Sequence, residues 1–259
     1  MYQIGLKLWS TNTGGYMHEA RRLYAQGVFD YIELFVVPDS VDALSAWQEL
    51  HDKDGVPFLI HNAHSATGFN LADAGCEKRN REIYAQTKAF ADALDSECVI
   101  FHGGVDGTIE ESARQLRNLG EHRALIENKP YLPLPGPLNS KVCRGATIEE
   151  IAYVIDKVGC GFCLDVGHAV CAANSQGIEP YSYIEKLAEF KPLVFHLSDV
   201  NDMTSQYDAH PHLGSGVLDI GRIKKRVFPE NAIVSIETIK EYAADLRDFE
   251  ADVNHLRMV

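Results

Sequence analysis

The sequence lacks long hydrophobic runs and any excess of basic residues. No apolar stretch approaches the roughly 18 residues that a membrane-spanning helix requires, and Met1 to Ser10 show no basic segment followed by an apolar one, as a signal peptide would. Lys and Arg number 24 against 37 Asp and Glu, a formal net charge of −13. We therefore expect a cytoplasmic protein with no membrane partner. We also expect no basic surface that could bind a long stretch of nucleic-acid backbone.

The sequence also lacks signs of several domains or of a disulfide framework. It has no linker, low-complexity tract or internal repeat, and its 259 residues suit one α/β barrel, so we predict a single domain over residues 1–259. Among six scattered cysteines, Cys160 and Cys163 form a CxxC pair without a second CxxC. Residues three apart on a strand face opposite sides. We predict free thiols in the core, with a zinc or redox role for this pair as the alternative.

Short apolar runs recur along the whole chain, and hydrophobic residues make up 46% of it. There are eight such runs, rich in β-branched and aromatic residues and apolar on both faces: 3–9, 31–37, 57–63, 98–104, 123–128, 161–168, 193–199 and 232–238. This pattern is typical of parallel strands that are buried on both sides.

Amphipathic helical patterns fill the gaps between these runs. Thr108 with Glu111, and Thr147 with Glu150, have the spacing of a capping box at a helix start. Strands that alternate with helices in this way predict a closed (β/α)8 barrel, a TIM barrel. An open, doubly wound sheet is the alternative, although no GxGxxG follows the first run, which weakens a dinucleotide-binding version.

Histidines and carboxylates gather where the predicted strands end. The candidates are His61, with His64 just beyond, His102, Glu127, Asp165 with His168, His196 with Asp199, Glu237, and Asp208, His210 and His212 in the loop after the seventh strand. A barrel brings its strand ends into one mouth, where unpaired carboxylates and imidazoles would repel or stay unsatisfied. Divalent cations remove this conflict because these groups are their preferred ligands. The sequence therefore predicts a metal site.

Six motifs at these positions resemble those of the xylose-isomerase-like barrels, a superfamily that includes endonuclease IV, sugar isomerases and sugar epimerases. They are FHGG at 101–104, IEN at 126–128, LDVGH at 164–168, HLSD at 196–199, DAHPHLGSG at 208–216 and IET at 236–238. The resemblance spans nearly the whole chain, and it implies a TIM barrel and a metal-dependent enzyme.

The superfamily has two metal patterns, and this sequence has counterparts of both. Single-metal isomerases and epimerases use four residues, which match Glu127, Asp165, His196 and Glu237. Endonuclease IV binds three zinc ions with five further ligands, and their counterparts are His102, His168, Asp208, His210 and one of His61 and His64. Ending the third strand at the motif favours His61, whereas counting back from Asn70-Leu71 favours His64; we prefer His61.

Two functions follow from these patterns. The first is a multinuclear zinc enzyme, with up to three ions, that hydrolyses a phosphoester in a small or single-stranded substrate, with Glu127 bridging two ions. The second is a sugar or sugar-phosphate isomerase or epimerase with one Mn, Co or Mg ion, in which Glu127 and Glu237 shuttle a proton through an enediolate. A barrel that only binds a ligand is a third reading, against which the intact ligand set argues.

Other residues are candidates for substrate contact or for support of the metal ligands. Lys7, Trp9, Lys129 and Arg144 are placed to contact a sugar or its phosphate; the alternatives are rim or loop charges, and simple packing for Trp9. Glu33 and Asp199 are candidates to accept a proton from a ligating histidine, since such partners are usual, or are polar rim residues.

Two departures from endonuclease IV disfavour duplex DNA as the substrate. The stretch from Val37 to Trp47 is short and has no Lys or Arg, where the endonucleases carry an extended basic segment. Lys129 stands where they have a small polar residue. The proline-rich segment from Lys129 to Gly145 follows the fifth strand, so we expect it to lie over the catalytic face.

Overall fold

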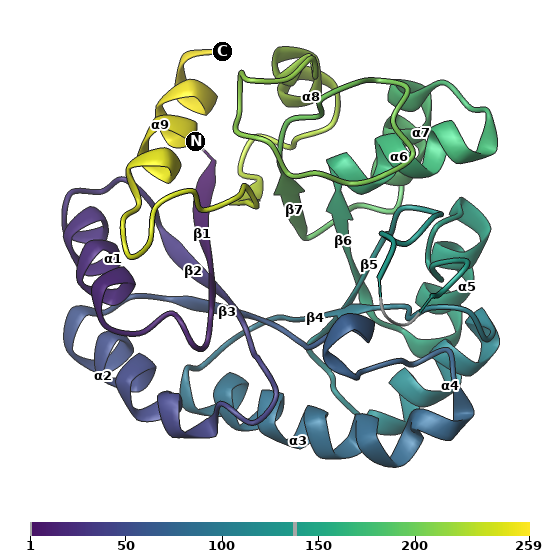
Figure 1. The fold of residues 1–259 in the computed structure, drawn as a ribbon, viewed down its shortest axis with the longest axis horizontal. Helices are drawn as coiled ribbons and strands as arrows, with labels where there is room; N and C mark the ends of the chain where they lie inside the picture. Colours follow the sequence, from purple (N-terminus) through teal and green to yellow (C-terminus); the bar gives the residue numbers. More distant parts are fainter. Residues whose placement is uncertain (1, 137–138) are drawn as a thin grey trace.

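The chain folds into a closed barrel of parallel strands surrounded by helices (Figure 1). The structure is a computed structural model that describes residues 2–136 and 139–259; Met1 and Pro137 of the segments discussed above lie outside them. Strands β1 to β8 pair in chain order, and β1 also pairs with β8. The predicted (β/α)8 barrel is confirmed, and the open-sheet alternative is wrong because this last pairing closes the sheet.

The strands and helices alternate as the sequence indicates. The strands are β1 Gln3–Trp9, β2 Tyr31–Phe35, β3 Phe58–His61, β4 Val99–His102, β5 Ala124–Glu127, β6 Gly161–Asp165, β7 Val194–Leu197 and β8 Ile233–Ile236. The α-helices are α1 Gly15–Ala25, α2 Leu44–Asp54, α3 Glu77–Ala93, α4 Ile109–Leu119, α5 Ile148–Val158, α6 Val166–Gln176, α7 Pro180–Ala188, α8 Ile220–Arg226 and α9 Arg247–Met258. Short 3₁₀ helices cover Val41–Ala43, Ser65–Thr67 and Ala74–Cys76.

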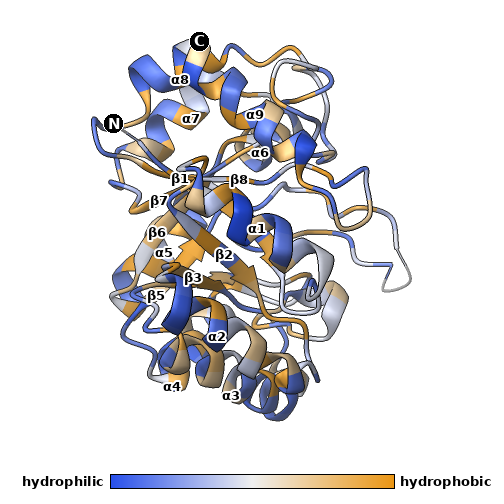
Figure 2. Ribbon diagram, turned by 90° about the vertical axis from the view of Figure 1, so that its left-hand side faces the viewer, coloured by the Kyte–Doolittle hydropathy of each residue, from blue (hydrophilic) through white to orange (hydrophobic). Residues whose placement is uncertain are grey.

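Most of the apolar core lies between the barrel wall and the helices. Figure 2 shows hydrophobic strands at the centre and helices with hydrophilic residues around them. A second, smaller cluster of Ile100, Leu125, Cys163 and Val194 fills the barrel interior. Cys160 and Cys163 are both free thiols, and Cys163 is fully buried, as predicted for a core residue. Within the described ranges, no helix has the length and apolar character that crossing a membrane requires.

The helix starts explain where the strands stop. The prediction that the sixth strand runs to His168 is wrong, because α6 already begins at Val166. The side chain of Asp165 accepts a hydrogen bond from the backbone N–H of His168 at 2.6 Å and so caps this helix. Thr108 and Thr147 cap α4 and α5 in the same way, as their spacing predicts.

Candidate metal centre

The functional side chains form one layer inside the C-terminal end of the barrel. Side chains alternate between the two faces of a strand, so one residue per strand reaches this layer. These residues are Lys7, Glu33, His61, His102, Glu127, Asp165, His196 and Glu237. The strand register makes direct neighbours of His102 and Glu127, and of Asp165 and His196.

The first group of possible ligands is His61, His102 and Glu127. The Nε2 atoms of His61 and His102 lie 2.9 and 3.0 Å from Oε2 of Glu127. Nδ1 of His61 donates to the carbonyl of Asn62 at 2.7 Å. In the neutral ring, Nε2 therefore carries a lone pair, and this lone pair faces the carboxylate of Glu127. Burial lowers the pKa of His102 well below its usual value, which favours a neutral ring. A lone pair on Nε2 of His61 beside a carboxylate oxygen suits a cation.

His64 has a different environment from His61. Its Nδ1 accepts a hydrogen bond from the backbone N–H of Ala66 at 3.2 Å and caps a short 3₁₀ turn. Its ring stacks on that of His102, with the centroids 5.3 Å apart. Burial lowers the pKa of His64 to about 3. The structure therefore brings His61 against Glu127 and His64 against the ring of His102.

The second group is Asp165, His196 and Glu237. Nε2 of His196 lies 2.9 Å from Glu33, which leaves Nδ1 directed at Oε2 of Glu237, 2.9 Å away. Glu33 also contacts Lys7 at 2.7 Å. Burial by itself raises the pKa of Glu33, but the charges of His196 and Lys7 outweigh it and bring the pKa to about 2. Glu33 is thus an ionised acceptor that orients the His196 ring, the geometry of a metal-supporting carboxylate.

The third group is His168, Asp208 and His210. Oδ2 of Asp208 lies 3.2 Å from Nε2 of His168 and 2.5 Å from Nε2 of His210. His168 comes from the first turn of α6, and the other two come from the loop after β7. His210 has a φ of 48°, a left-handed conformation that few residues other than glycine adopt. Backbone strain of this kind gathers at functional sites.

The chemistry of these donors fits divalent cations. In each of the three groups, one ligand atom per residue lies within 4.8 Å of the others. Oε1 of Glu127, Nδ1 of His196 and Nδ1 of His210 are buried without a hydrogen-bond partner. Burial lowers the pKa of His168, but Asp165 and Asp208 raise it to about 10. The carboxylates thus hold a proton on this imidazole, and a metal would displace such a proton.

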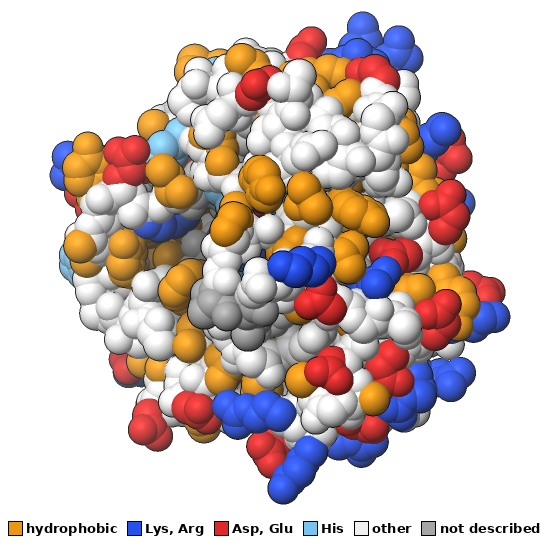
Figure 3. All heavy atoms as spheres, turned by 45° about the vertical axis from the view of Figure 1, so that its right-hand side comes forward, with side chains coloured by type: hydrophobic (Ala, Val, Ile, Leu, Met, Phe, Trp, Pro, Cys, Tyr) orange, Lys and Arg blue, Asp and Glu red, His pale blue; other side chains and the backbone are white. Residues whose placement is uncertain are grey.

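A cleft of about 300 Å³ leads from the surface to this cluster. It is lined by Lys7, Trp9, Asn12, Tyr16, His210, Glu237, Thr238, Ile239 and Lys240. Trp9 is 56% exposed and packs against Phe35. Figure 3 shows histidine side chains inside a hollow bordered by hydrophobic side chains. Lys7 therefore lies at the floor of the cleft and Trp9 at its edge.

Two of the expected site residues instead hold loops in place. Arg144 donates to the carbonyls of Asp106 and Gly107 and pairs with Glu150, which ties the proline-rich segment to the loop after β4. Asp199 accepts from four backbone N–H groups: those of Val200, Gly214, Gly216 and Leu218. The expectation that Asp199 supports a ligating histidine is wrong, because its oxygens organise the loop that follows the third group. His212 pairs with Asp252 of α9.

Sequence reasoning gave one residue of the site a metal role only as an alternative, and it missed others. The thiol of Cys163 lies within 4.8 Å of ligand atoms of Glu127 and His196. Burial raises its pKa to about 12, so it stays a thiol when no metal is bound. Its position two residues before Asp165, on the same strand face, was the available signal. Asn12, Tyr16 and Lys240 line the cleft from loops and from α1, where no pattern marked them.

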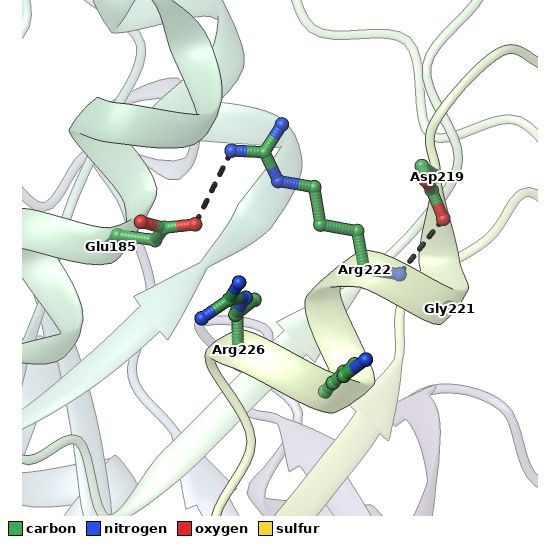
Figure 4. Close-up of a pocket in the computed structure, with 6 residues that line it drawn as sticks. Glu185, Asp219, Gly221, Arg222 and Arg226 are labelled. Carbon is green, nitrogen blue, oxygen red and sulfur yellow. Dashed lines mark hydrogen bonds and ion pairs between the residues drawn. The ribbon is translucent and has the colours of Figure 1, made fainter.

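A separate hollow lies on the outer wall, between α7 and α8. It has a volume of about 530 Å³ and is lined by Glu185, Asp219, Gly221, Arg222, Lys225 and Arg226. Figure 4 shows that Arg222 points to Glu185, with which it pairs at 3.3 Å. No residue of the three metal-ligand groups lines this hollow.

Comparisons with known proteins agree with this fold. A probable endonuclease 4 of Mycobacterium leprae is 30% identical over 201 residues, which is 73% of this chain and 76% of that protein. The endonuclease IV structure from Thermus thermophilus has a TM-score of 0.66 at 24% identity and covers 97% of this chain and 99% of its own. A D-tagatose 3-epimerase-like protein has a TM-score of 0.69 at 18% identity, covering 99% and 97%.

The last two similarities show the fold alone, since both identities are low. The family match is broader and covers nearly the whole barrel. Residues 21–258 match the family described as xylose isomerase-like TIM barrel, and the chain belongs to this family of enzymes.

Proposed function

We propose that this protein is a multinuclear, zinc-dependent phosphoesterase. The observation that carries the proposal is that the first, second and third groups of ligands converge around one carboxylate, Glu127. Its Oε2 faces His61 and His102, and lies 3.6 Å from Nδ1 of His196, while its Oε1 lies 2.9 Å from Nδ1 of His168. A single-metal site needs only the four strand-end residues from β5 to β8, and the additional histidines then have no role.

Each residue has a distinct role at the proposed metal site. Glu127 bridges the first two groups, with His61 rather than His64 as the third-strand ligand. Glu33 keeps Nδ1 of His196 directed at the cluster, and Lys7 holds Glu33 and Glu237 as carboxylates. Bound divalent ions would supply an activated water and would stabilise both the attacking and leaving oxygens of an in-line displacement at phosphorus.

The substrate that fits best is a small or single-stranded phosphoester. The cleft beside Glu237 and His210 is narrow, and the exposed face of Trp9 offers a stacking surface for a sugar or a base. The net charge of −13 and the short loop after β2 argue against the binding of duplex DNA. The relatives named endonuclease 4 are a reason to include abasic DNA among the substrates tested.

A sugar or sugar-phosphate epimerase is the second candidate. One observation favours it: Glu237, beside Lys7, lines the cleft, and Glu127 lies across His196 from it. Two carboxylates arranged in this way could exchange a proton on either side of an enediolate.

Metal analysis and activity assays separate the two functions. Protein purified without chelator is expected to carry more than one zinc ion per chain and to hydrolyse bis(p-nitrophenyl) phosphate or a single-stranded abasic oligonucleotide. A single manganese, cobalt or magnesium ion, together with ketose interconversion and no phosphoester cleavage, would replace the phosphoesterase with the epimerase.

A further inference from the structure

Lys129 places a fixed positive charge between the first and third ligand groups. Its Nζ lies 3.0 Å from Nε2 of His168 and 3.8 Å from Oε1 of Glu127. The side chain is 14% exposed, and its backbone N–H donates to the carbonyl of Gly145 at 2.9 Å. The residue is therefore anchored at the base of the proline-rich segment, with its ammonium group directed into the cluster.

This contact uses the nitrogen that a third metal ion would need. Nδ1 of His168 lies 3.0 Å from the carbonyl of Asn128, to which the neutral ring donates its N–H. When the ring gives up the second proton that Asp165 and Asp208 favour on it, Nε2 offers the one remaining lone pair of the ring. That lone pair can accept a hydrogen bond from Lys129 or bind a metal ion, but it cannot do both.

Charge favours the ammonium at this position. The third group contains one carboxylate, Asp208, whereas the first two groups share Glu127, Asp165 and Glu237. One ammonium compensates one carboxylate, and a divalent ion placed within a few ångströms of it would be repelled. At the first two groups the three carboxylates, together with Glu33, outnumber the one ammonium there, Lys7, and offset such repulsion.

We propose that Lys129 takes the place of a divalent ion at His168, Asp208 and His210, so that this chain holds two ions rather than three. The inference rests on the proposed multinuclear site and specifies its occupancy. The ammonium is part of the chain, so a chelator removes the two ions and leaves this third positive charge beside Glu127.

The number of bound ions tests this directly and needs no activity. Chelator-stripped protein is reloaded with excess zinc, freed of loose metal by gel filtration, and analysed by inductively coupled plasma mass spectrometry. Wild type is expected to hold two ions per chain, and Lys129→Met to hold three. In a zinc titration, affinity at the third group should rise on the order of 100-fold in Lys129→Met.

Lys141→Met is the matched control because it removes the same charge from the same segment. Lys141 is exposed, and its Nζ contacts Asn139 rather than the cluster. This variant should keep two ions. Lys129→Gln provides a second neutral variant if the methionine lowers the yield of folded protein, and a thermal melt of each variant checks folding.

The outcomes separate the inference from the proposed function. Three ions in wild type, or the same count in wild type and in both Lys129 variants, would overturn the role of Lys129. If that shared count is two or three, the multinuclear phosphoesterase survives. One ion in every variant would overturn both, since no multinuclear site would then exist.

Discussion

The two ends of β5 each carry a buried glutamate, and the two glutamates have opposite kinds of neighbours. Glu121 precedes the strand, and its oxygens accept from the backbone and guanidinium of Arg123 and from the hydroxyl of Tyr84, all within 3.0 Å. Glu127 ends the strand, and its neighbours are histidine nitrogens and, at 3.8 Å, the ammonium group of Lys129. Both carboxylates are 1% exposed.

The difference lies in where the protons are. Every neighbour of Glu121 brings its own hydrogen, so the carboxylate is satisfied by the protein alone. At Oε2 of Glu127, the ring of His61 gives its N–H to Asn62 and turns Nε2 inward, while the ring of His196 gives one N–H to Glu33 and turns Nδ1 inward. A buried carboxylate oxygen that faces a lone pair requires an added cation or proton, and this marks Oε2 of Glu127 as part of a binding site rather than of a structural ion pair.

Replacing Glu127 should have the largest effect. Glu127→Gln removes the carboxylate shared by the groups, so we expect loss of bound zinc and a fall in phosphoesterase activity of about 10³-fold, because metal stabilisation is worth several kcal/mol. Glu121→Gln is the matched control, and it should keep both metal and activity. Equal metal loss in the two variants would contradict the claim that Glu127, and not Glu121, belongs to the metal site.

Replacing Glu33 should have a smaller effect. Glu33→Gln weakens the acceptor that orients His196, and loss of such a partner costs roughly 10–100-fold in metal affinity. A competitive zinc titration with a chromophoric chelator measures the change. Retention of wild-type affinity would show that the packing of the His196 ring, and not its hydrogen bond, directs Nδ1 at the cluster.

Glu121→Gln should lower stability and change its pH dependence. Loss of charged hydrogen bonds costs about 2 kcal/mol, or roughly 5 °C in Tm, at neutral pH. Burial raises the pKa of Glu121, but Arg123 and Tyr84 outweigh it and bring the pKa to about 2. A carboxylate whose pKa is lowered in the folded state stabilises the folded protein at pH values above its unfolded pKa of about 4.3. This stabilisation is lost as the pH falls towards the folded-state pKa.

The stability gap between wild type and Glu121→Gln should therefore be full at pH 7 and smaller at pH 3. Urea unfolding of the metal-stripped proteins at the two pH values measures this gap without a contribution from zinc. A gap that stays constant would mean that Glu121 acts through its shape and not through its charge.

The sequence by itself determined the barrel and the composition of the cluster. Alternating strand and helix patterns indicated the order of elements, and the histidines and carboxylates at strand ends had to share one mouth because parallel strands in a barrel end on one side. The strand ends made Glu127, Asp165, His196 and Glu237 candidates, and the resemblance to the xylose-isomerase-like barrels implied that they form one ligand set.

Only the tertiary structure decided what each polar group faces. Asp199 and Arg144 occupy rim positions like the others, yet their partners are backbone groups of distant loops, which no local pattern encodes. A loop charge is one of the two roles that the sequence allows Lys129, and the tie between its N–H and Gly145 turns it into the cluster. Whether a buried charge meets a proton or a lone pair depends on ring orientation and long-range packing, so the difference between Glu121 and Glu127 emerges only in the folded chain.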